Sequence, residues 1–170
     1  MRVNPSIIGF LSGERPDDRG RYLQDILRWP DDRLESVHDF IQWMFPLTES
    51  SPVNPDAPVL DADTIVEIRS TPSLQHAVRS SWLRMLDFYG LEASGERVEQ
   101  AAEFEAKSRN WLRANNHNHL RITRILKCLR LCGLEREARA FFERLAHIYE
   151  REGADAITKT TFRFWKEAVS

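Results

Sequence analysis

The chain has 170 residues, of which 24 are basic and 26 acidic, so its formal net charge is −2. A charge this small excludes nucleic-acid binding driven by the charge of the whole chain. Hydrophobic residues make up 42% and charged residues 29%, a composition typical of globular and not of disordered proteins. No apolar run is long enough for a membrane span, and the first residues do not resemble a signal peptide. We therefore expect one soluble, cytoplasmic domain spanning residues 1–170.

The positive charge is concentrated in one segment. Residues 106–134 contain no acidic residue and seven basic ones, namely Lys107, Arg109, Arg113, Arg121, Arg124, Lys127 and Arg130. The rest of the chain has 17 basic and 26 acidic residues, a net charge of −9. The segment is either a binding surface for an anionic partner or a solvated face balanced by acidic residues elsewhere in the fold.

The first third of the chain predicts an irregular arm and two helices. Residues 1–15 are expected to form the arm, whose apolar side chains can pack on a core. A short helix is predicted over about 17–27, and a helix over about 31–45 that is apolar on more than one side, as central helices are. Residues 46–59 hold four of the eight prolines and predict a long loop.

Helical periodicity continues to the end of the chain. Asp61 is predicted to cap a short helix, and Thr71 with Pro72 to begin a longer one that ends at Gly90. Further helices are expected over 98–113, 119–132 and 135–150, with a last one capped by Asp155. The pattern predicts an all-α fold of about seven or eight helices and no sheet.

Catalytic signatures are absent from the sequence. It contains no glycine-rich phosphate loop, no nucleophile elbow and no zinc-protease motif. No catalytic residue, metal ligand or cofactor is therefore predicted. An uncharacterised enzyme using the acidic and histidine residues between Asp32 and Asp39 is an alternative. Cys128 and Cys132, four residues apart on a helix, could face a metal, but core packing is favoured.

Several polar and aromatic residues have a structural interpretation. His117 and His119 are expected to be solvated at a polar helix start. His38, at the edge of an apolar helix face, is expected to be hydrogen-bonded. Trp29 is expected to be partly exposed, whereas the apolar positions of the basic helix, Ile122, Ile125, Leu126, Leu129 and Cys132, are expected to face the core.

Three segments together resemble a known family. Residues 32–47 (DRLESVHDFIQWMFPL), 85–90 (MLDFYG) and 118–127 (NHLRITRILK) are similar, in order and spacing, to three blocks of the opioid growth factor receptor conserved domain. The resemblance extends over roughly residues 10–133. It implies a helical domain without catalytic activity. The family's named member is a receptor for the enkephalin pentapeptide, is associated with the nucleus and its envelope, and restrains cell proliferation.

The resemblance implies a non-enzymatic binding or signalling module. The expected partner is a peptide or an acidic protein, and the family also implies association with the nucleus and peripheral association with its membrane. The candidate binding residues are Arg121, Arg124, Lys127 and His38. The alternative is a nucleic acid or another phosphate ligand bound by the basic helix 119–132.

Overall fold

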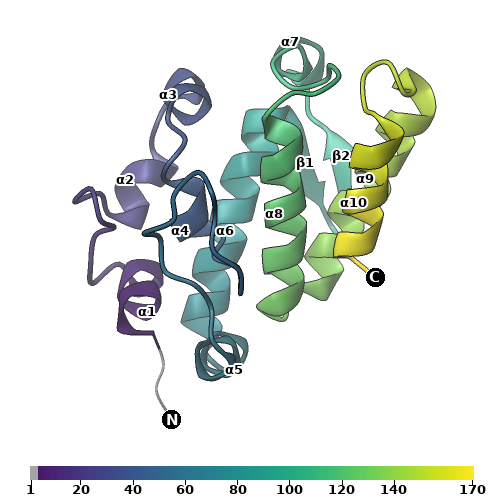
Figure 1. Ribbon diagram of the computed structural model, residues 1–170. Helices are drawn as coiled ribbons and strands as arrows, with labels where there is room; N and C mark the ends of the chain where they lie inside the picture. The colour runs from purple at the N-terminus through teal and green to yellow at the C-terminus, as the bar shows by residue number, and fades with distance from the viewer. Residues whose placement is uncertain (1–3) are drawn as a thin grey trace. The chain divides into compact units, whose positions relative to one another are not determined.

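The computed structural model describes residues 4–170, and in this part of the chain the fold is almost entirely helical (Figure 1). The elements are α1 (Pro5–Ser12), α2 (Leu23–Leu27), α3 (Asp31–Ser36), α4 (Ile41–Met44), α5 (Ala62–Ser70), α6 (Pro72–Tyr89), β1 (Leu91–Ser94), β2 (Arg97–Gln100), α7 (Phe104–Ser108), α8 (Asn118–Leu131), α9 (Glu135–Glu152) and α10 (Lys159–Ala168). The predicted helical fold is confirmed. The ten helices of residues 4–170 exceed the predicted seven or eight, because several are shorter than expected.

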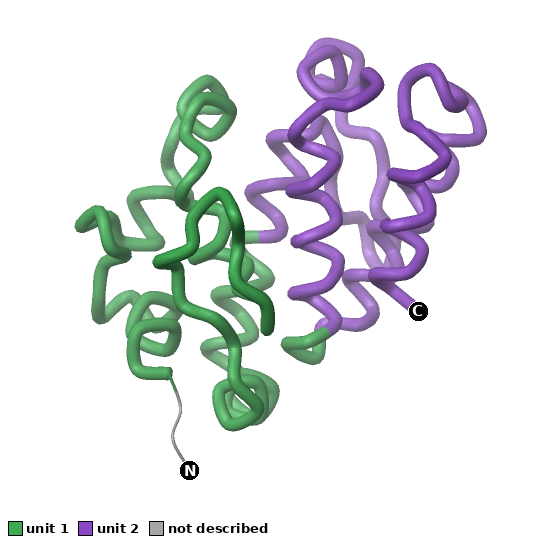
Figure 2. The backbone as a smooth tube through the Cα atoms, viewed as in Figure 1, with its two compact units in different colours: residues 1–81, 131–133 green, residues 82–130, 134–170 purple. Residues whose placement is uncertain are grey.

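The chain forms two compact units, coloured separately in Figure 2. Unit 1 contains α1 to α5, the first part of α6 and residues 131–133. Unit 2 contains the last part of α6, the β1–β2 hairpin, α7, α9, α10 and nearly all of α8. The boundary crosses α6 between Ser81 and Trp82, within one continuous helix. A compact unit is not by itself an independently folding domain, so the single domain remains a prediction.

The expected irregular arm over residues 1–15 is wrong where the structure describes it. Residues 1–3 lie outside the described part, and α1 begins directly after them. The Asn4 side chain accepts hydrogen bonds from the backbone N–H groups of Ser6 and Ile7, and Pro5 occupies the first turn. Asparagine followed by proline is a favourable helix start. The apolar side of α1 is buried as expected, through Ile7, Phe10 and Leu11.

The helix predicted over 31–45 is two short helices, α3 and α4, with residues 37–40 between them. Every residue from Phe40 to Leu47 is buried. The apolar run is therefore surrounded by the protein on all sides, and no solvent-facing helix surface remains over it. The predicted loop over 46–59 is confirmed, since these residues contain no helix or strand.

A group of ion pairs in unit 1 surrounds Arg21. Its guanidinium lies 2.7 Å from the carboxylate of Asp17 and 2.8 Å from that of Asp39. Partial burial disfavours the charge of Asp39, but the hydrogen bond and charge of Arg21 outweigh it and hold the pKa of Asp39 below its ordinary value. The network joins the turn before α2 to the segment between α3 and α4.

Trp29 is buried, so the prediction of partial exposure is wrong. Only 7% of the residue is accessible. The guanidinium carbon of Arg33 lies 4.1 Å from the centre of the indole, and the ring of Phe40 meets it edge-on at 5.5 Å. The cation over the ring face excludes water while keeping its own charge at the surface.

The predicted helix over 98–113 is also wrong. Unit 2 contains instead an antiparallel hairpin that pairs Leu91 with Gln100 and Ser94 with Arg97, followed by the short helix α7. The two-residue connection begins with Gly95 at a φ of +59°, which suits the tight turns that match strand twist. The short Ser-Gly-Glu turn was the available signal, and the helical periods on either side obscured it.

The helices α8, α9 and α10 each bury apolar side chains. The apolar positions predicted for the basic helix are confirmed, since Ile122, Ile125, Leu126, Leu129 and Cys132 are fully buried. Cys128 and Cys132 are free thiols with no accessible surface, as predicted for core packing. The last helix, α10, is capped by the Thr158 hydroxyl and not by Asp155. Within residues 4–170, none of the helices has the length and apolar character needed to cross a bilayer.

Candidate functional site

The start of α8 contains a group of buried polar residues. Asn116 accepts a hydrogen bond from the backbone N–H of Asn118 at 2.9 Å, and its own amide donates to the carbonyl of Asn110. These bonds satisfy backbone groups at a helix start that would otherwise lie buried without partners. The asparagines of this segment are therefore structural residues that fix where α8 begins.

His119 is buried and not solvated, which corrects the expectation from the sequence. Its Nε2 lies 2.8 Å from the carbonyl oxygen of Trp111, and the indole N–H of Trp165 donates to the His119 carbonyl at 3.1 Å. Burial lowers the pKa of His119; the bond to Trp111 opposes that shift, and the charge of His117 adds to it. The neutral imidazole that donates from Nε2 is the form that satisfies this geometry.

Three of the four candidate binding residues lie on α8. Arg121 is only 5% accessible, and its guanidinium donates to the side chain of Asn118 at 3.4 Å. Its burial differs from the solvent-facing position predicted by helical spacing. Arg124 and Lys127 are half-buried, three and six residues further along the helix. His38 is exposed and lies in unit 1, outside any helix, between α3 and α4.

Part of the positive charge of the basic segment is balanced locally. Lys107 lies 3.1 Å from the carboxylate of Asp87 and 3.5 Å from that of Glu103. Its ammonium also donates to the backbone carbonyl of Asp87 at 2.8 Å, close to the end of α6. Arg109 pairs with Glu105 one turn earlier at 3.4 Å. The charges of Lys107 in α7 and of Arg109 just after it are therefore balanced by nearby carboxylates, although only 17% of the Lys107 side chain is accessible.

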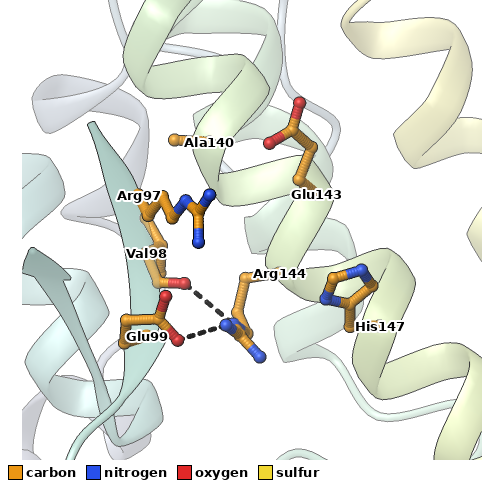
Figure 3. Close-up of a pocket in the computed structure, with 7 residues that line it drawn as sticks. All are labelled: Arg97, Val98, Glu99, Ala140, Glu143, Arg144 and His147. Atoms are coloured by element: carbon orange, nitrogen blue, oxygen red, sulfur yellow. Dashed lines mark hydrogen bonds and ion pairs between the residues drawn. The ribbon is translucent and has the colours of Figure 1, made fainter.

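A second feature of unit 2 is a groove between β2 and α9 (Figure 3). One cavity of about 260 Å³ is lined by Arg97, Val98, Glu99, Ala140, Glu143, Arg144 and His147. Arg144 joins its two walls, because its Nε donates to the Val98 carbonyl at 2.8 Å and its Nη2 pairs with Glu99. Through this bond an α9 side chain provides a hydrogen-bond donor for a backbone carbonyl oxygen of β2.

A larger cavity of about 650 Å³ continues the groove towards the start of α9. It is lined by Glu96, Arg97, Glu135, Arg136, Arg139, Ala140 and Glu143. Arg97, Ala140 and Glu143 line both cavities. We call the two together the β2–α9 groove. The sequence predicted a helix over 135–150 but not the groove, because without the hairpin nothing places Arg97 opposite α9.

Comparison with known proteins finds one matching family. The family model described as the opioid growth factor receptor conserved region matches residues 15–157. The opioid growth factor receptor of Homo sapiens is 40% identical over 122 residues, covering 68% of this chain and 18% of the relative. The Mus musculus receptor is 38% identical over 122 residues, covering 68% of this chain and 19% of the relative.

A receptor-like relative is similar to the same extent. Opioid growth factor receptor-like protein 1 of Xenopus tropicalis is 36% identical over 126 residues, covering 71% of this chain and 24% of that protein. The aligned part of this chain thus spans about a fifth to a quarter of the length of these curated relatives. No solved structure matches the chain significantly.

Proposed function

The chain belongs to the opioid growth factor receptor family, and we propose that it is a non-enzymatic binding module that acts in signalling by holding a peptide or an acidic protein segment. The observation that carries this proposal is the family match over residues 15–157, together with relatives that are named as receptors for a growth factor. The opioid growth factor appears in the names of those relatives and describes them alone. For this chain we propose only that the ligand belongs to the same class, a peptide.

Arg124, Lys127, Arg121 and His38 are the residues proposed to contact the partner. Arg124 and Lys127 are three residues apart, a spacing that puts them on neighbouring positions of the α8 surface. Both are half-buried, which restricts their side chains and lowers the entropy lost when a ligand is bound. Arg121 is proposed to act by its fixed positive charge beneath this surface, because only 5% of the residue is accessible.

Isothermal titration with the enkephalin pentapeptide and with short acidic peptides tests the proposal. We expect heat of binding from at least one of them, and weaker binding by the double variant R124Q/K127Q. Arg113→Gln is the matched control, because Arg113 is an exposed cation of the same basic segment outside α8. Absence of heat from every peptide at millimolar protein would contradict the peptide-binding function.

A nucleic-acid duplex belongs in the same experiment as a competing ligand. Binding that depends on contacts to phosphates weakens steeply as salt is raised. Tight duplex binding with such a slope, lost in R124Q/K127Q, would replace the peptide proposal with nucleic-acid binding by α8.

A further inference from the structure

The larger cavity of the β2–α9 groove is lined by three arginines that form no ion pair within the described residues, together with three glutamates. Arg97 extends from β2, and Arg136 and Arg139 lie one turn apart on α9; all three are exposed and line the larger cavity. Among residues 4–170, none of the three forms an ion pair or a side-chain hydrogen bond. Three guanidinium groups around one cavity repel each other, and an oxyanion placed between them would relieve that repulsion through charge-assisted hydrogen bonds.

The groove is held open by contacts of its own. Arg144 spans it, bonded to the Val98 carbonyl and paired with Glu99, and so links α9 to β2 (Figure 3). Ala140, which lines both cavities, has a side chain too small to fill the space between the walls. A ligand entering such a groove would lose little free energy to rearrangement of the protein.

The shape and charge of the groove favour one class of ligand. Its lining residues on α9 extend from Glu135 to His147, which at the rise of an α-helix is roughly 18 Å, long enough for several residues of extended chain. Glu96, Glu135 and Glu143 also line the larger cavity, and within the described residues neither Glu96 nor Glu143 has an ion pair. These carboxylates would repel the closely spaced phosphates of a nucleic acid, but not a peptide with one or two acidic groups placed at the arginines.

We infer that the β2–α9 groove binds an extended acidic peptide segment, with Arg97, Arg136 and Arg139 holding its carboxylates. This inference rests on the proposed function and names a binding surface for the same kind of partner. It adds three contact residues from β2 and α9 to the proposed contacts on α8.

Fluorescence anisotropy with a labelled peptide carrying two glutamates, and with its glutamine analogue, tests the inference. We expect R136Q/R139Q to bind the acidic peptide at least about tenfold more weakly than the unmodified protein, a loss of about 1.4 kcal/mol or more, because both substitutions remove charge-assisted contacts to the ligand. The glutamine analogue should bind the unmodified protein with a similar loss. R136K/R139K, which keeps both charges, should recover part of the affinity.

The matched control is R113Q/R151Q, which removes two exposed arginines of unit 2 outside the groove and should change the affinity by less than about twofold. Equal binding by R136Q/R139Q and this control would overturn the groove as the site. If the same peptide binding is then abolished by R124Q/K127Q, the proposed function stands and only the groove is excluded. If no peptide binds the unmodified protein, both are overturned. Thermal melts that coincide for all variants show that the comparison reports binding and not unfolding.

Discussion

Replacing His119 with phenylalanine should change how the stability of the protein depends on pH. In the folded protein burial lowers the pKa of the His119 imidazole, so that at acidic pH it binds less proton than the same group in water. The same histidine in the unfolded chain titrates near pH 6.5. As the pH falls below about 6.5, the unfolded chain takes up a proton that the folded protein does not, and the free energy of unfolding decreases by up to about 1.4 kcal/mol per pH unit. This contribution to stability is complete above that pH and is lost progressively below it.

The substitution has a second effect at neutral pH. Phenylalanine preserves most of the ring volume beside Trp165, whose ring centre is 5.5 Å from the imidazole. It cannot donate to the Trp111 carbonyl, which His119 approaches to 2.8 Å. A buried carbonyl that loses its donor costs about 1–3 kcal/mol. The variant should therefore be less stable by about that amount at pH 7.5, and the difference should shrink as the pH falls below 6.5, by at most about 1.4 kcal/mol per pH unit.

Urea unfolding of both proteins measures this difference in the free energy of unfolding. The measurements are made at about pH 7.5, 6.5 and 5.5, which lie above, at and below the pKa of histidine in the unfolded chain. His117, whose charge also lowers the pKa of His119, is retained in both proteins. The control His147→Phe removes an exposed imidazole from the same unit and should change stability by no more than about 0.5 kcal/mol at pH 7.5. A His119→Phe deficit that stays constant across the three pH values would refute the reasoning.

Two further predictions concern packing and backbone conformation. Leu126→Ala should destabilise the protein by about 2–5 kcal/mol, because Leu126 has no accessible surface. Leu120→Ala on the same helix should cost less than about 0.5 kcal/mol, because Leu120 is 71% exposed. Similar losses of stability for the two variants in chemical denaturation would contradict the assigned buried and exposed faces of α8. Gly90→Ala should cost more than Gly95→Ala. Both glycines have positive φ, which costs an alanine about 1–2 kcal/mol, but a Cβ on Gly90 would lie 2.8 Å from Cα of Phe104, while one on Gly95 meets nothing within 4 Å. Equal unfolding midpoints for these two variants would show that α7 moves away from Gly90 without cost.

The sequence determined those elements whose signals are local. The apolar period of residues 119–132 placed α8 and its buried side, and Thr71 followed by Pro72 marked the start of α6. Gly90 marked its end through the positive φ that follows Tyr89. These signals depend on residues within one or two helical turns, so they can be read without knowing the rest of the fold. The three family blocks are continuous segments for the same reason.

Only the tertiary structure decided which polar side chains are accessible. Helical spacing put Arg121 among the solvent-facing cations and His119 at a solvated helix start, yet both are buried. His119 is covered by Trp111, eight residues before it, and by Trp165, which is 46 residues after it. No periodicity within α8 contains that information. Burial depends on which distant segments pack over a position, and the apolar free energy gained by those segments outweighs the solvation of one polar group.

The β2–α9 groove depends on the same kind of long-range arrangement. Arg97 and Arg139 line one cavity although 42 residues separate them, and the hairpin that brings Arg97 there was hidden by helical periods on either side. The sequence by itself determined the family, the helical class and the inward faces of the main helices. The fold decided which charges meet across a gap, because contacts between distant segments form only when the whole chain packs.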